Sequence, residues 1–110
     1  MTAPLFQSSG DLIADRRLAI AQDLLARDPA GAADLLMQAI EAAPRFISAW
    51  FALGELREKT GARDEAIAAF QQVCALDAED RLGAGLHLVR LGALAPGDMP
   101  SAYVRTLFDQ

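Results

Sequence analysis

The sequence predicts an all-α protein, and three observations support that fold class. The chain has 110 residues, is rich in Ala and Leu, and is 53% hydrophobic, which is enough for a helical core. β-Branched residues are scarce, and no segment alternates apolar and polar residues over the length of a strand. Apolar residues instead recur at helical spacing between short polar, glycine or proline breaks. We therefore expect five to six helices in antiparallel pairs.

The first two helices are predicted over residues 10–27 and 30–43. Ser8 or Ser9 is placed to cap the first of them. Pro29 suits the opening of the second, because its fixed φ is helical and its missing N–H is not needed there. The Asp-Pro break makes these two helices the first pair.

The next pair is predicted over residues 45–60 and 63–76. Gly54 has no side chain, so the second helix can approach the first closely. Ala66 offers a small surface opposite, and Phe70 fills the space that remains. The two helices are therefore expected to lie antiparallel, in contact through this glycine.

A tight turn separates the helices of this pair. Gly61 can adopt the left-handed conformation that ends a helix. Asp64 and Glu65 follow in the first turn of the next helix, where the macrodipole favours negative charge. Glu55 and Lys59 are spaced for an i,i+4 ion pair on the outer face.

A fifth helix is predicted over 79–94 and a last one over 100–108, separated by an Ala-Pro-Gly-Asp break. The glycines of residues 82–85 resemble a nucleotide-binding loop only superficially, because no strand precedes them and a third glycine is missing. Close helix packing is the expected reason for them. The last helix is expected to dock onto another surface through an apolar stripe made of Tyr103, Val104, Leu107 and Phe108.

The pattern W-x2-L-G followed by A-x3-F resembles the tetratricopeptide repeat (TPR), a helix-turn-helix unit of about 34 residues. Arg57 stands where Tyr is usual, Val73 where a small residue is usual, and Ala78 where proline often closes the unit. The resemblance implies a TPR-like superhelix whose first helices line a concave protein-binding groove. The matching residues are Trp50, Leu53, Gly54, Ala66 and Phe70.

The units on either side of the best repeat are degenerate, as is expected at the ends of a solenoid. The predicted organisation is a flexible N-terminal arm over 1–9, repeats over 10–94, and a loop with the C-terminal docking or linker helix over 95–110. Within the repeats we distinguish a degenerate unit over 10–44, the best unit over 45–78 and a partial unit over 79–94.

The resemblance also implies which residues face the groove. That surface is apolar with an acidic side, so an apolar or helical segment bearing Arg or Lys suits it better than an acidic tail. Phe51 has a second interpretation, in which it only packs against a neighbouring helix. The predicted groove residues are Ser48, Phe51, Glu55, Glu58, Leu82 and Val89.

The end of the chain, Ala102–Gln110, resembles the segment that joins a TPR region to the catalytic domain in bacterial class I S-adenosylmethionine-dependent methyltransferases. The resemblance implies that this chain is the N-terminal module of such an enzyme. S-adenosylmethionine would bind a glycine-rich loop beyond Gln110, so no cofactor is expected here. The alternative is a free-standing adaptor or homodimerising scaffold.

The chain itself is not expected to be an enzyme or a metalloprotein. His87 is the lone histidine and Cys74 the lone cysteine, so neither a catalytic triad nor a ligand cluster can be assembled from them. The acidic turn 77–80 offers a weak cation site as the alternative to a solvated turn.

Charge and composition bear on the partner and the compartment. The net charge of -5 and a pI near 4.6, without a basic stripe, disfavour nucleic acid as a partner. No stretch is long and apolar enough for a membrane span, and the N-terminus lacks a signal-peptide pattern. A single cysteine fits a reducing cytoplasm. We therefore expect a cytoplasmic protein whose partner is a protein or peptide, its own catalytic domain, or a second copy.

Overall fold

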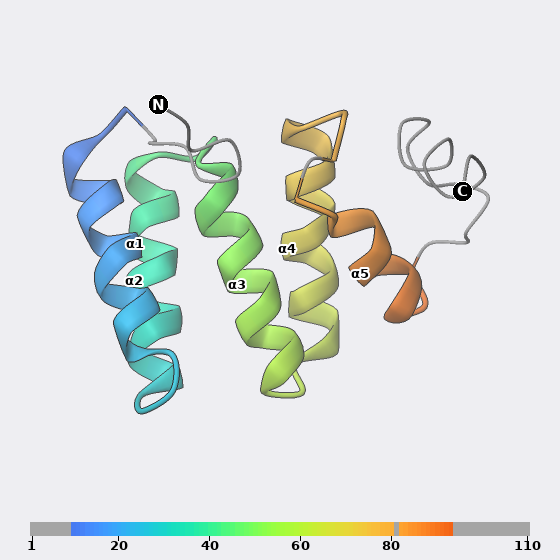
Figure 1. Ribbon diagram of the computed structural model, residues 1–110, viewed down its shortest axis with the longest axis horizontal. Helices are drawn as coiled ribbons and strands as arrows, with labels where there is room; N and C mark the ends of the chain where they lie inside the picture. Colours follow the sequence, from blue (N-terminus) through green and yellow to red (C-terminus); the bar gives the residue numbers. More distant parts are fainter. Residues whose placement is uncertain (1–9, 81, 94–110) are drawn as a thin grey trace.

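The computed structural model describes residues 10–80 and 82–93, and this part of the chain is helical without a strand (Figure 1). Figure 1 shows the helices side by side, and each packs against its neighbours along the chain. The all-α prediction and the antiparallel pairing are thereby confirmed. The helices are α1 (Leu12–Leu24), α2 (Pro29–Ala42), α3 (Ile47–Lys59), α4 (Arg63–Leu76) and α5 (Ala84–Arg90).

Aspartates begin the first two helices. The carboxylate of Asp11 accepts hydrogen bonds from the backbone N–H groups of Ile13 and Ala14, at 2.9 and 3.1 Å. Asp11 is therefore the cap of α1, in place of the serine expected in this role. Asp28 caps α2 in the same way, and Pro29 takes the first helical position as predicted.

The turn between α3 and α4 forms as predicted. Gly61 has a left-handed backbone with φ of +85°, and the Ala62 N–H donates to the carbonyl oxygen of Arg57 at 2.8 Å. These contacts satisfy carbonyl groups at the end of α3 and reverse the chain within three residues. Asp64 and Glu65 then lie in the first turn of α4, as predicted.

Helix α5 is shorter than predicted, because the chain cannot be helical before Ala84. Asp80 and Gly83 both have positive φ, at 51° and 82°. The Asp80 carboxylate accepts hydrogen bonds from the N–H groups of Ala84 and Gly85, both at 2.7 Å, and so fixes where the helix begins. Gly83 thus serves a turn outside the helix, and not the close helix packing expected of it.

The described residues form two hydrophobic core clusters, and one of them centres on Phe70 of α4, which contacts α3. Phe70 of α4 is fully buried, and a Cβ atom placed on Gly54 of α3 would lie 2.8 Å from its ring carbons. The absent side chain of Gly54 is therefore what admits the ring. Ala66 is also fully buried on α4.

Trp50 is half-buried beside this contact. Its ring packs against the cluster that contains Phe70, and its Nε1 donates to the carbonyl oxygen of Pro44 at 2.9 Å. The indole therefore ties the start of α3 to the loop that precedes it.

None of the helices in residues 10–80 and 82–93 is long and apolar enough to cross a membrane. The helix predicted over 100–108, with its apolar stripe, lies outside the described residues.

We predict that Gly54→Ala lowers the free energy of unfolding by about 1–3 kcal/mol, because the new methyl group would overlap the Phe70 ring. Helix propensity alone would give the opposite sign, a gain of about 1 kcal/mol. Urea unfolding of Gly54→Ala, Phe70→Leu and the double variant tests this. The double variant should be less destabilised than the sum of the single changes; strict additivity would argue against the contact.

Candidate functional site

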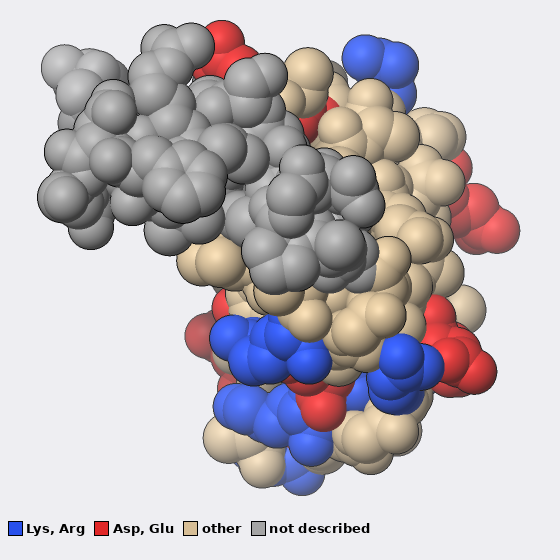
Figure 2. All heavy atoms as spheres, turned by 90° about the vertical axis from the view of Figure 1, so that its right-hand side faces the viewer, with Lys and Arg blue, Asp and Glu red and all other residues tan. Residues whose placement is uncertain are grey.

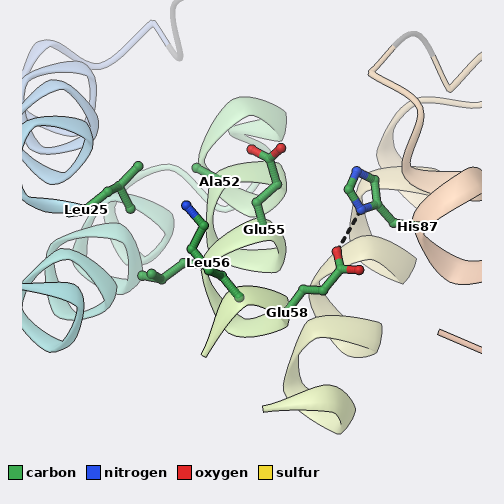
Figure 3. A pocket seen from close by; sticks show the side chains of 7 residues that line it. Leu25, Ala52, Glu55, Leu56, Glu58 and His87 are labelled. Atoms are coloured by element: carbon green, nitrogen blue, oxygen red, sulfur yellow. Dashed lines mark hydrogen bonds and ion pairs between the residues drawn. The ribbon is translucent and has the colours of Figure 1, made fainter. Parts of the chain in front are cut away.

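A pocket of about 370 Å³ opens on the face formed by α1, α3 and α5 (Figure 3). One wall comes from Leu25, directly after α1, and the opposite wall from His87 of α5. Helix α3 supplies the floor, because positions three, four and seven residues apart share one face of a helix. The floor residues are Ala52, Glu55, Leu56, Glu58 and Lys59.

His87 holds α5 against this floor. Its ring stacks on Phe70, with centroids 4.4 Å apart and planes at 14°, and meets the ring of Phe51 edge-on at 5.4 Å. Its Nδ1 lies 2.8 Å from Oε1 of Glu58. No carboxylate lies at ligand spacing from His87 along the chain, and its carboxylate partner, Glu58, comes from another helix.

Arg90 completes a network of three side chains between α3 and α5. Its guanidinium donates to both carboxylate oxygens of Glu58, at 2.9–3.2 Å. Its Nη2 also lies 2.7 Å from Nδ1 of His87. Because Nδ1 carries either a proton or a lone pair, it donates to Glu58 in one state and accepts from Arg90 in the other. Either state leaves the α3–α5 contact bridged.

The network sets the acidity of Glu58. Burial of the carboxylate would by itself raise its pKa, but the hydrogen bonds and positive charges of His87 and Arg90 outweigh burial and lower that pKa. Glu58 is therefore held as a carboxylate that serves the fold.

Glu55 and Lys59 differ from Glu58. Both are exposed at the pocket, and the ion pair expected between them is not formed within the described residues. Exposed ion pairs of this kind add little stability, because water screens the charges and two long side chains must be ordered. The pocket thus presents one carboxylate and one ammonium group to solvent, one helical turn apart.

The other residues predicted to face the groove lie elsewhere. Ser48, Leu82 and Val89 are half-buried and do not line this pocket. Phe51 is also half-buried and contacts Phe70 edge-on, with ring centroids 5.6 Å apart, which matches the interpretation of Phe51 as a packing residue. The C-terminal docking residues, Tyr103, Val104, Leu107 and Phe108, lie outside the described residues.

A second hollow, of about 440 Å³, lies at the turn between α1 and α2 and the end of α3. Its lining is mainly loop and helix-end residues, among them Arg27, Asp28 and Thr60. This second hollow lies between the α1–α2 pair and the end of α3. The first pocket is instead lined by Leu25 at the end of α1, by α3 and by α5. The first pocket is therefore the better candidate site.

The acidic turn before α5 has a structural task. Asp80 is buried and caps the helix, and burial raises its pKa despite the hydrogen bonds from Gly85 and Ala84. Within the described residues no three His, Cys, Asp or Glu side chains are grouped to hold a metal ion. Burial, with the charges of Asp80 and Asp77, raises the pKa of Cys74 to about 11, so its thiol stays protonated at neutral pH.

Figure 2 shows the face at the α5 end, where basic and acidic side chains alternate in its lower part. At the end of α5, Arg63 donates to the carbonyl oxygen of Leu91 at 2.6 and 3.0 Å and pairs with Asp64 at 3.3 Å. Arg90 is bound to Glu58. These cations stabilise the end of α5 and are not a free basic surface.

Searches against models of known protein families and against curated proteins gave no match for this sequence. The candidate site therefore rests on the geometry described above.

We predict that Glu58→Gln lowers the free energy of unfolding by about 1 kcal/mol at pH 7, because it removes the charge that His87 and Arg90 share. The folded-state pKa of Glu58 is lowered, so its contribution is present above the ordinary pKa and is lost as the pH falls through the lowered value. Urea titrations from pH 7 to pH 3 should show the free energies of unfolding of wild type and Glu58→Gln becoming equal in acid. The control is Glu41→Gln on α2; a gap that persists at pH 3 would contradict the charge-based account.

Proposed function

We propose that this chain is a TPR-like helical module that binds a protein segment in the pocket between α1, α3 and α5. The observation that carries the proposal is that one pocket is lined by α3, by α5 and by Leu25 at the end of α1, which is where a stack of antiparallel pairs presents its inner face. The contact between Gly54 and Phe70 supports it further, because these residues belong to the repeat-like pattern and hold α3 and α4 together.

The lining favours a peptide ligand over a small polar metabolite. Leu25, Ala52 and Leu56 give the pocket an apolar surface beside its charged groups. The pocket is open to solvent and has a volume of about 370 Å³, so it suits a side chain or two from a longer segment. Catalysis is not part of the proposal.

We also propose that the module is the N-terminal region of a methyltransferase, on the resemblance of Ala102–Gln110 alone. The reading frame after Gln110 tests this directly. Continuation into a strand followed by a glycine-rich loop and a helix would support it. A stop codon at that point would leave the alternative, a free-standing adaptor or homodimer, and the mass of the chain in solution would then distinguish those two.

The binding function is tested by blocking the pocket. We predict that Ala52→Gln weakens the binding of peptides that were selected on the wild-type protein from a random 16-residue phage library. The expected loss of affinity is about tenfold, or ~1.4 kcal/mol, because the longer side chain fills the pocket. Ala68→Gln is the matched control, since Ala68 is exposed on α4 and does not line the pocket. Thermal unfolding should confirm that both variants fold. Equal affinity for the two variants, or no enriched peptides, would overturn the proposal.

A further inference from the structure

We infer that the segment bound in this pocket carries one cationic side chain, Arg or Lys, and that Glu55 is the residue that recognises it. The inference rests on the proposed function, because it names the chemistry of the ligand for the same pocket. It follows from comparing the three charged side chains of the lining, which are Glu55, Glu58 and Lys59.

The carboxylate of Glu58 is already bound by other side chains of the protein. Both of its oxygens accept hydrogen bonds from Arg90, and Oε1 lies 2.8 Å from Nδ1 of His87. A cationic ligand at Glu58 would have to displace Arg90 and loosen α5 from α3. Glu58 therefore offers little to a ligand.

Glu55 is the carboxylate that stays available. Its side chain is exposed, and no hydrogen bond or ion pair to it is formed within residues 10–80 and 82–93. Figure 3 shows the Glu58 carboxylate turned toward His87, while the carboxylate of Glu55 is directed away from that pair. An Arg or Lys of a ligand can reach Glu55 without breaking any contact of the fold.

The surroundings of Glu55 limit the ligand to a single cation with an apolar neighbour. Lys59 lies one turn further along α3 in the same pocket and repels a second positive charge there. Leu25 and Leu56 supply apolar surface beside the carboxylate. The net charge of -5 favours the approach of such a cationic segment. The ligand is therefore an apolar peptide segment with one Arg or Lys.

The test uses peptides selected from the random phage library on the full chain. Their consensus should contain one Arg or Lys next to apolar residues. Glu55→Gln should raise the Kd of the selected peptide about three- to tenfold, which is the size of effect expected when an exposed ion pair at a partly apolar site is lost. Glu41→Gln, which makes the same change outside the pocket, should leave Kd unchanged.

A charge exchange makes the test specific. Glu55→Arg should nearly abolish binding of the selected peptide, and replacing the Arg of the peptide by Glu should restore binding to that variant only. If the selected peptides are neutral or acidic and Glu55→Gln binds them as well as wild type, the inference falls. The proposed function then still stands, provided that Ala52→Gln blocks the same peptides; if Ala52→Gln binds them too, both proposals fall.

Discussion

The ring of Phe70 lies against the backbone of α3 at Gly54, and the inner face of the molecule depends on this contact. Any larger residue at position 54 would push α4 away from α3, since the ring is fully buried and has no free space to move into. His87 stacks on the same ring, at a centroid distance of 4.4 Å. One aromatic residue thus sets the spacing of α3, α4 and α5 together.

The polar network between α3 and α5 is the second consequence of this arrangement. Once His87 is stacked on Phe70, its Nδ1 comes within hydrogen-bonding distance of Glu58, and Arg90 reaches the same carboxylate. Glu58 is thereby used to hold the pocket wall, whereas Glu55, three residues earlier, stays open to solvent. Two glutamates on one helix have different roles because only one of them faces α5.

Local signals were sufficient for much of the fold. The bounds of α4, the left-handed Gly61 and the position of Pro29 all follow from the residues next to them, and the structure confirms them. The start of α5 was predicted too early, because its helical spacing gave no sign that Asp80 would take a positive φ and cap the helix from four residues before it. Capping by a buried carboxylate is a tertiary feature as much as a local one.

The candidate site was less accessible from the sequence. Glu55 and Glu58 were identified as facing the groove, but the contact between Glu58 and His87 joins residues 29 positions apart, beyond what periodicity can show. Leu25 was missed because α1 departs from the repeat-like pattern. Ala52 was missed because a small side chain is informative only when the space above it is known.

The arrangement is tested most directly by the NMR signals of the two Gly54 Hα protons. Because the Phe70 ring lies where a Cβ would stand on Gly54, the account predicts a strong NOE to that ring from the Hα proton on this side, with its chemical shift displaced by the ring current. Ordinary helical glycine shifts without NOEs to that ring would contradict it, and with it the placement of α5 and the pocket.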